Sequence, residues 1–286
     1  MGTTQDSDFV SKFSGLSDKE WLNLLISSCE NTKIGEIDFP GFPSQEIQEQ
    51  FGGSSFEHTL REAFRFYVEV KSYALKIGNK LAPSKTILDF GCGWGRITRF
   101  FLKDIYATNI HAIDVDPLIV EVTKQIIPGI NVEPCNPSPP LNYENNSMDY
   151  VIAYSVFSHL AENVQIEWIR EFSRILKPNG LLVVTTHSRN FLDFCKSLIG
   201  QEHESNWHKA LATAFEDIES VKKQYDEGNF IFSPTGGGGN RTPDFYGEAV
   251  IPRQYVESHW TEFLKFHDFI DNSNRLPQAL IVMQKN

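Results

Sequence analysis

The stretch that decides the fold is Thr86-Ile-Leu-Asp-Phe-Gly-Cys-Gly-Trp-Gly-Arg-Ile-Thr-Arg-Phe-Phe101. Residues 87–90 form a short apolar run, which is typical of a strand covered on both faces. Gly91, Gly93 and Gly95 follow at alternate positions, where missing side chains let the backbone turn sharply and let a ligand approach closely. Apolar residues then recur at helical spacing, and the start of a helix directs free N–H groups at such a ligand. The stretch therefore predicts a buried strand, a ligand-binding turn and the start of an amphipathic helix.

Strand-like and helix-like segments alternate after this turn. Strands are expected at residues 109–114, 130–133, 150–154 and 181–186, and helices at residues 118–127 and 164–176. Asp116 followed by Pro117 fits a helix N-cap and a first helical residue. Strands that are separated by helices imply right-handed parallel crossovers, so we predict an α/β fold with a doubly wound sheet.

Two further strand-like segments close the chain, at residues 262–271 and 278–284. The loop between them, residues 272–277, contains Asn, Ser and Pro, which are turn-forming residues. This pattern indicates an antiparallel hairpin at the edge of a parallel sheet. The complete prediction is a mostly parallel seven-stranded sheet with an antiparallel C-terminal edge hairpin.

Two segments lie outside the alternation. Residues 1–80 show helical patterns only, with capping-box spacing at Ser17–Glu20 and again at Ser54–Glu57. Residues 188–245 interrupt the strand rhythm. They include a polar helix expected at residues 210–225, a short strand expected at 229–232 and four consecutive glycines at 236–239.

These segments suggest four parts of the chain. We expect an N-terminal helical extension at residues 1–80 and a ligand-binding core at 81–187. An inserted substrate cap is expected at 188–245, with the glycine run as its flexible hinge or lid tip. Residues 246–286 would supply the C-terminal strands that complete the sheet.

The composition restricts the classes of partner. The chain of 286 residues has a net charge of −11, which argues against nucleic acid as a partner because such binders usually carry a basic surface. The four cysteines are typical of reduced intracellular thiols, and none forms a pair at metal-ligand spacing, so no metal site is predicted. The polar N-terminus does not resemble a secretory signal, and no apolar run approaches the ~20 residues that span a bilayer. We expect a soluble cytoplasmic protein without a membrane partner, and the sequence does not indicate its oligomeric state.

The spacing of the glycines distinguishes between cofactors. A dinucleotide fingerprint, G-x-G-x-x-G, would need glycine at position 96, where this sequence has Arg96. A phosphate-binding P-loop is absent. Asp89 closes the strand before the turn, where a carboxylate suits a sulfonium or ammonium group better than a pyrophosphate. Asp114 ends the next strand, where an acid can accept both hydroxyl protons of a ribose. The pattern favours a positively charged nucleoside, and S-adenosylmethionine fits.

Four segments resemble motifs of the class I S-adenosylmethionine-dependent methyltransferases. Residues 87–96 resemble the first motif, residues 112–117 the second, residues 147–160 the fourth-strand motif and residues 172–182 the late helix–turn–strand motif. Together they cover roughly residues 80–187. The Ser-Val-Phe-Ser-His-Leu run at 155–160 and the closing Pro-Gln strand resemble most a bacterial subgroup that acts on small molecules, sugars or secreted polymers.

The resemblance implies a set of cofactor contacts. It places Asp89, Gly91 and Gly93 around the methionine moiety, with Cys92 in the same turn. It places Asp114 at the ribose, Val115 beside the adenine and Asn136 at the adenine amino group. Tyr154 and Phe157 would line the methyl-transfer cleft.

Two histidines are candidates for catalysis. Methyl transfer is an in-line displacement, in which positioning dominates and a base is needed only if the acceptor must lose a proton. His159 and His187 follow the fourth and fifth strands, at the carboxyl edge where such sheets bind ligands. Histidine can titrate near neutral pH. Each is a candidate base, and the alternative is a hydrogen-bonded histidine that orients a loop. Tyr246 and Glu248, beside the glycine run, rank lower.

The favoured interpretation is methyl transfer to an oxygen or nitrogen of a small-molecule, sugar or peptide acceptor. The alternatives are a nucleic-acid or protein methyltransferase and a non-catalytic cofactor-binding or scaffold relative. The acidic charge disfavours the nucleic-acid version, as does the absence of an Asn/Asp-Pro-Pro-Tyr motif after Tyr154. The sequence does not indicate which acceptor is methylated.

Overall fold

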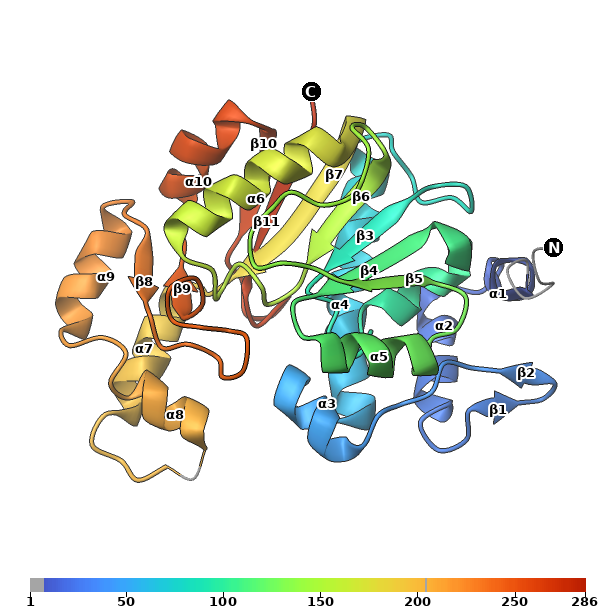
Figure 1. Cartoon of the computed structure of the whole chain (residues 1–286), viewed down its shortest axis with the longest axis horizontal. Helices are drawn as coiled ribbons and strands as arrows, with labels where there is room; N and C mark the ends of the chain where they lie inside the picture. The colour runs from blue at the N-terminus through green and yellow to red at the C-terminus, as the bar shows by residue number, and fades with distance from the viewer. Residues whose placement is uncertain (1–7, 204) are drawn as a thin grey trace. The chain divides into compact units, whose positions relative to one another are not determined.

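One seven-stranded sheet organises the chain in the computed structural model, which describes residues 8–203 and 205–286 (Figure 1). The strand order is β10-β11-β7-β6-β3-β4-β5. Parallel pairs join β3 (Ile87–Phe90) to β4 (Ile110–Asp114) and β6 (Met148–Ala153), and β4 to β5 (Asn131–Pro134). β10 (Lys265–Ile270) and β11 (Ala279–Gln284) form an antiparallel hairpin. The predicted α/β class, the mostly parallel sheet and the edge hairpin are confirmed.

The chain divides into two compact units, which we call the first and the second unit. The first comprises the residues up to Cys135 together with Asn146–Tyr154 and Asn179–Leu181. The second comprises Asn136–Asn145, Ser155–Pro178 and Leu182–Asn286. β7 (Leu176–Thr186) contributes residues to both.

Helices precede the strands in the first unit. They are α1 (Asp8–Phe13), α2 (Asp18–Ser27), α3 (Gln45–Gly52) and α4 (Phe56–Lys76). A small hairpin, β1 (Lys33–Ile34) with β2 (Ile37–Asp38), lies between α2 and α3 in the chain. The remaining elements are η1 (Thr98–Lys103), η2 (Ala107–Asn109) and α5 (Pro117–Ile126).

The second unit contains the helices that follow β6 in the chain. They are α6 (Glu162–Ile175), α7 (Arg189–Leu198), α8 (Asn206–Leu211), α9 (Ile218–Asp226), α10 (Arg253–His259) and η3 (Trp260–Glu262). An antiparallel pair, β8 (Ile231–Ser233) with β9 (Glu248–Val250), accompanies them.

Local sequence signals place several helix starts correctly. The side chain of Asp116 accepts a hydrogen bond from the Leu118 N–H at the start of α5, with Pro117 as the first helical residue. Ser17 and Glu20 form the expected capping box of α2. The second predicted box is wrong: the N-cap of α4 is Ser55, without a side-chain cap bond. The Phe56 N–H instead donates to the Gln48 side chain, so a contact from α3 determines where α4 begins.

The segment after the glycine turn is not the predicted amphipathic α-helix. Thr98–Lys103 forms a 3₁₀ helix in which every residue is buried. Polar members of this helix face inward: the Arg99 guanidinium donates to the carbonyl of Gly41 and lies over the rings of Phe42 and Trp94. Because these inward contacts replace a solvent-facing side, the amphipathic pattern does not persist.

The single polar helix predicted at residues 210–225 is also wrong. Helix α8 ends at Leu211 and α9 begins at Ile218. Asp217 caps α9 by accepting a hydrogen bond from the Ser220 N–H at 3.1 Å. Phe215, between the two helices, is buried in the same apolar cluster as Leu211 and Ile218. Burial of this aromatic ring and the Asp217 cap together divide the helix.

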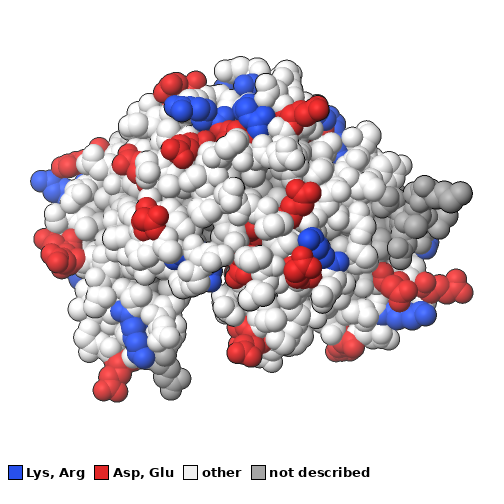
Figure 2. Space-filling view, viewed as in Figure 1, with Lys and Arg blue, Asp and Glu red and all other residues white. Residues whose placement is uncertain are grey.

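Charged side chains are scattered among other residues on the face drawn in Figure 2, and both signs are present. Over residues 8–203 and 205–286, no helix is both long and apolar enough to cross a membrane.

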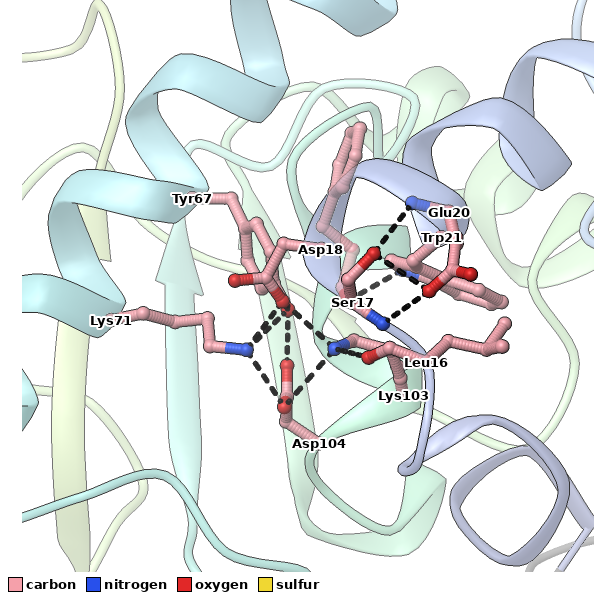
Figure 3. Close-up of polar contacts among 10 residues, drawn as sticks. Leu16, Ser17, Asp18, Glu20, Trp21, Tyr67, Lys71, Lys103 and Asp104 are labelled. Atoms are coloured by element: carbon pink, nitrogen blue, oxygen red, sulfur yellow. Dashed lines mark hydrogen bonds and ion pairs between the residues drawn. The ribbon is translucent and has the colours of Figure 1, made fainter.

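A partly buried ion-pair network joins α2, α4 and η1 in the first unit (Figure 3). Asp18 accepts hydrogen bonds from Lys71 at 2.6 Å and from Lys103 at 2.8 Å. Asp104 accepts from Lys71 at 3.1 Å and from the hydroxyl of Tyr67. Burial opposes ionisation of Asp18, but the bonds from the two lysines outweigh it and lower the pKa of this carboxyl. The network therefore stabilises the helical extension most when its carboxylates are ionised.

Replacing Lys103 by methionine is expected to lower the free energy of unfolding by roughly 1.5–3 kcal/mol at pH 7, the value of a charge-assisted hydrogen bond. The Lys103 ammonium is 3% exposed and donates to Asp18 and to the Leu16 carbonyl, so the substitution removes both bonds, while Asp18 keeps the bond from Lys71. The folded pKa of Asp18 lies below its unfolded value, so this contribution is present above the unfolded pKa and is lost as the pH falls through the folded one. Urea unfolding at pH 7 and pH 3 measures the difference, which should shrink at pH 3. Lys124→Met, at an exposed pair with Glu121, is the control and should cost under about 1 kcal/mol.

Candidate functional site

The glycine turn after β3 depends on left-handed backbone conformations. Gly91, Gly93 and Gly95 have φ angles of 73°, 51° and 75°, which side chains other than glycine rarely tolerate. A Cβ atom at Gly95 would also lie 2.4 Å from the Ile127 side chain. The N–H groups of Gly91 and Cys92 donate to the Ile113 carbonyl at 2.8 and 3.0 Å, so the turn is fastened to β4.

Asp114, at the end of β4, holds the same turn. One carboxylate oxygen accepts a hydrogen bond from the Gly93 N–H at 2.9 Å, and the other accepts from the Asp116 N–H at 3.0 Å. Asp114 is buried. The structure thus gives this residue a role in shaping the glycine turn that the sequence did not predict.

Asp89 is a buried carboxylate beside the turn. It is 2% exposed and accepts a hydrogen bond from the Thr98 hydroxyl at 2.6 Å. Burial raises the pKa of Asp89 to about 7; the Thr98 bond lowers it, the charge of Asp114 raises it further and that of Arg96 lowers it. A carboxyl in this state is stabilised in its ionised form by a nearby cation. Its chemistry therefore suits a ligand that carries positive charge.

Tyr154, at the end of β6, is held by a polar contact with α4. Its hydroxyl donates to Glu62 at 3.0 Å, and Arg96 donates to the same carboxylate oxygen at 3.0 Å. The Arg96 guanidinium lies 5.0 Å from the centre of the Tyr154 ring, and Phe66 packs on that ring edge-on. Glu62 was missed because no local motif marks a helix residue that meets a side chain 92 positions away.

The other predicted cofactor contacts have different surroundings. Cys92 is buried against Ala112, Val120 and Val132, and burial raises the pKa of its thiol well above the usual value, so its side chain behaves as an apolar packing group. Val115 follows Asp114 directly and is half-buried. Asn136 is exposed and belongs to the second unit. The structure thus places Asp89, Gly91, Cys92, Gly93, Asp114, Val115 and Tyr154 in the first unit.

The second unit brings the two candidate histidines to one carboxylate. The Nε2 atom of His187 lies 2.9 Å from Oε2 of Glu248, and Nδ1 of His159 lies 3.5 Å from the same oxygen. His187 follows β7, Glu248 begins β9, and a parallel bridge joins His187 to Val250. Glu248, ranked low from the sequence, is the centre of this cluster.

The hydrogen-bond partners of the His159 and His187 rings indicate which nitrogen of each imidazole carries the proton. Nδ1 of His159 lies 2.9 Å from the Gly247 carbonyl, which can only accept, so this nitrogen carries a proton. Nε2 of His187 likewise donates to Glu248. The remaining nitrogen of each ring is then the basic one. Burial lowers the pKa of both histidines, so the rings are neutral at pH 7.

The three side chains also have ligand atoms within 4.8 Å of one another, a spacing that a metal ion could bridge. Nδ1 of His159 and Nε2 of His187 both lie at hydrogen-bond distance from an oxygen, and a metal ion would have to displace the protons in these bonds. Burial raises the pKa of Glu248, and the charge of His159 and the bond from Trp207 oppose that rise.

Aromatic rings fix the orientation of both imidazoles. His187 stacks on Phe191 with ring centres 3.6 Å apart, and His159 stacks on Tyr246 at 4.9 Å. The Nε1–H of Trp207 donates to Oε1 of Glu248 at 2.9 Å. The predicted glycine hinge is joined to this region, since the Gly236 N–H donates to the Tyr246 carbonyl at 3.1 Å.

Comparison with known proteins identifies the core of the chain. A family model described as a methyltransferase domain matches residues 87–180. An uncharacterized methyltransferase of Bacillus subtilis, YodH, is 28% identical over 160 residues, which are 49% of this chain and 64% of that protein. The 2-methyl-6-phytyl-1,4-hydroquinone methyltransferase of Synechocystis is 30% identical over 106 residues, 36% of this chain and 32% of that protein. The chain thus matches less than two thirds of the length of either relative.

A solved structure shares the fold. The S-adenosylmethionine-dependent methyltransferase of Clostridium acetobutylicum superposes with a TM-score of 0.53 at 12% identity, covering 78% of this chain and 91% of the other.

Proposed function

Because the chain belongs to the class I S-adenosylmethionine-dependent methyltransferases, we propose that it methylates an oxygen or nitrogen atom of a small-molecule, sugar or peptide acceptor. S-adenosylmethionine is the cofactor. The observation that carries the choice of oxygen or nitrogen is the neutral imidazole of His187, hydrogen-bonded to buried Glu248, with the His159 ring 3.5 Å from the same carboxylate. Hydroxyl and amine acceptors must lose a proton on methylation, and this cluster offers basic nitrogens to receive it. The hydroquinone substrate in the name of the Synechocystis relative supports a small-molecule acceptor.

We assign the cofactor to the glycine turn of the first unit. The methionine moiety would approach the backbone at Gly93, where an added Cβ atom would be in van der Waals contact with the Phe51 side chain at 3.7 Å. Asp89 would face the positive charges of that moiety, Asp114 the ribose, and Val115 and Asn136 the adenine. Gly91 and Cys92 would supply the wall of the turn, and Tyr154 would lie beside the transferred methyl group.

Residues of the second unit would accept the proton that the acceptor group loses. Bound S-adenosylmethionine would supply the electrophilic methyl carbon, and breaking of its carbon–sulfur bond would give S-adenosylhomocysteine as the product. The acceptor O–H or N–H bond breaks as its proton moves to the basic nitrogen of His187, and the acceptor atom then bonds to carbon. Glu248 stabilises the imidazolium that results, through the Nε2–H bond. His159, beside the same carboxylate, is the second candidate base. Residues 188–245, which contain α7 to α9, would serve as the substrate cap.

Isothermal titration with S-adenosylmethionine, followed by radiolabelled methyl transfer to a panel of phenols, amines and sugars, tests this function. We expect one molecule bound per chain and label on oxygen or nitrogen. Binding with label only on carbon would contradict the proposed acceptor class. Binding without transfer to any acceptor, small molecule or protein, would favour a cofactor-binding relative without catalysis.

Cofactor affinity should depend on pH through Asp89. The pKa of this carboxyl is about 7 in the free protein, and the positive cofactor should lower it. Below pH 7 binding must then release a proton, so the Kd for S-adenosylmethionine should rise by up to about tenfold per pH unit between pH 7 and pH 5. Calorimetric titration in two buffers that differ in ionisation enthalpy measures the number of protons released on binding.

The pH dependence should disappear in Asp89→Asn and persist in Asp116→Asn, which alters only the helix cap nearby. If the wild-type Kd for S-adenosylmethionine stayed constant from pH 5 to pH 8, Asp89 would not be the residue that contacts the positive charge of the cofactor.

A further inference from the structure

A pocket of about 320 Å³ opens beside the imidazole of His187 in the second unit. Its walls come from helix α7, helix α8 and the loop between β10 and β11. The surface that lines it is mostly apolar. A volume of this size suits one small molecule of one or two rings.

Aromatic side chains form one wall of the pocket. Phe191 and Phe194 lie 6.4 Å apart between ring centres, and Phe194 lies 6.1 Å from Trp207. Phe194 is 38% exposed and Trp207 is 45% exposed. Large aromatic rings left open to water around one pocket are typical of a ligand-binding surface. The wall therefore favours a flat apolar partner that stacks on it.

The charges of the pocket restrict its ligand. None of the lining side chains within the described part of the chain is a lysine or an arginine, and the one carboxylate is Asp271. A phosphate or carboxylate on the ligand would find no cationic partner there and would meet Asp271. An uncharged ligand avoids both the repulsion from Asp271 and the free-energy cost of burying a charge without a partner.

One carboxylate links the aromatic wall to the proposed base. Glu248 accepts from Trp207 with Oε1 and from His187 with Oε2, both at 2.9 Å. A ring lying on Trp207 is thus held next to the residue that would take its proton. His187 is itself part of the pocket lining.

We propose that this pocket binds the methyl acceptor, an uncharged aromatic molecule whose ring stacks on Phe194 and Trp207 and whose hydroxyl faces His187. The inference rests on the proposed function and names the acceptor class for it. On methylation the phenolic O–H bond would break and its proton would go to His187, while the oxygen would bond to the methyl carbon as the carbon–sulfur bond of S-adenosylmethionine breaks to give S-adenosylhomocysteine.

Binding of 2-naphthol, measured by calorimetry on the full chain, tests the proposal directly. Sodium 2-naphthoate has the same rings with a negative charge, and methyl glucoside represents a sugar. We expect 2-naphthol to bind at least tenfold more tightly than either. Trp207 is the one strongly exposed tryptophan among the five, since the others are at most 1% exposed, so bound naphthol should also protect tryptophan emission from acrylamide quenching.

Two substitutions at one position separate stacking from the bond to Glu248. Trp207→Ala should weaken 2-naphthol binding about tenfold, whereas Trp207→Phe keeps a ring and should stay within about threefold of wild type. Ile199→Ala, at an exposed apolar residue that does not line the pocket, should change nothing. Equal binding of naphthoate or methyl glucoside, or unchanged naphthol affinity in Trp207→Ala, would overturn the proposal.

This result is independent of the cofactor. Titration of the same preparations with S-adenosylmethionine tests the proposed function separately. Failure to bind S-adenosylmethionine would count against the proposed function, and the naphthol measurements would still test the pocket. Naphthol binding without methyl transfer would likewise support the pocket while counting against its role as the acceptor site.

Discussion

Glu248→Gln is expected to reduce the rate of methyl transfer by about 100-fold or more while leaving the Kd for S-adenosylmethionine unchanged. General-base catalysis contributes roughly 10²–10⁴-fold, and the amide cannot stabilise a charged imidazolium as the carboxylate does. Glutamine keeps one acceptor oxygen, which can still accept from the Trp207 N–H, so the pocket wall remains in place. Its NH₂ group can pair with Nε2 of His187 only if that ring changes tautomer, which moves the ring proton onto the nitrogen that would act as the base. The loss should therefore fall on kcat and leave the KM for the acceptor within a few-fold.

Single-turnover transfer of radiolabelled methyl groups to the best acceptor of the panel measures this effect. His187→Ala should show a loss of similar size, and His159→Ala a smaller one, since only Nε2 of His187 lies at hydrogen-bond distance from the carboxylate. Glu219→Gln, at an exposed glutamate of the same unit, is the matched control. Full activity in Glu248→Gln would show that no proton passes through this cluster.

Asp114→Ala is expected to weaken S-adenosylmethionine binding by at least about 100-fold. Two charge-assisted hydrogen bonds to the ribose would be lost, each worth roughly 1.5–3 kcal/mol, and 1.4 kcal/mol corresponds to about tenfold in Kd. The same substitution removes the acceptor of the Gly93 and Asp116 N–H groups. Both effects act in the same direction, and calorimetry measures their sum.

A cofactor analogue separates the two effects. If Asp114 binds the ribose, wild type should bind 2′-deoxy-S-adenosylhomocysteine more weakly than S-adenosylhomocysteine, and Asp114→Ala should not distinguish the two. If the residue only shapes the turn, the preference should be the same in both proteins. Asp116→Ala, which removes the cap of α5 two residues away, should leave the affinity within about threefold.

Sequence patterns correctly predicted the elements that depend on contacts between residues close together in the chain. The apolar run Ile87–Phe90 is a strand because each of its side chains is buried, and the glycines that follow have the left-handed angles that their spacing indicated. Asp116 and Ser17 cap their helices through bonds within three residues. Such signals require no knowledge of the rest of the fold.

Contacts between distant residues account for what the sequence did not show. The 3₁₀ helix at Thr98–Lys103 depends on partners such as Gly41 and Asp18, which are 58 and 85 positions away from Arg99 and Lys103. Glu248 lies 61 positions from His187, and no motif connects them. The candidate histidines could be selected from their places after predicted strands, but their shared carboxylate became visible only in three dimensions.

Amide hydrogen exchange with and without S-adenosylmethionine shows where the cofactor binds. We expect slower exchange at the N–H groups of residues 89–95 and 114–115 when the cofactor is present. Exchange in those residues that is unchanged by saturating cofactor, with protection confined to another part of the chain, would contradict the assignment of the cofactor to the glycine turn.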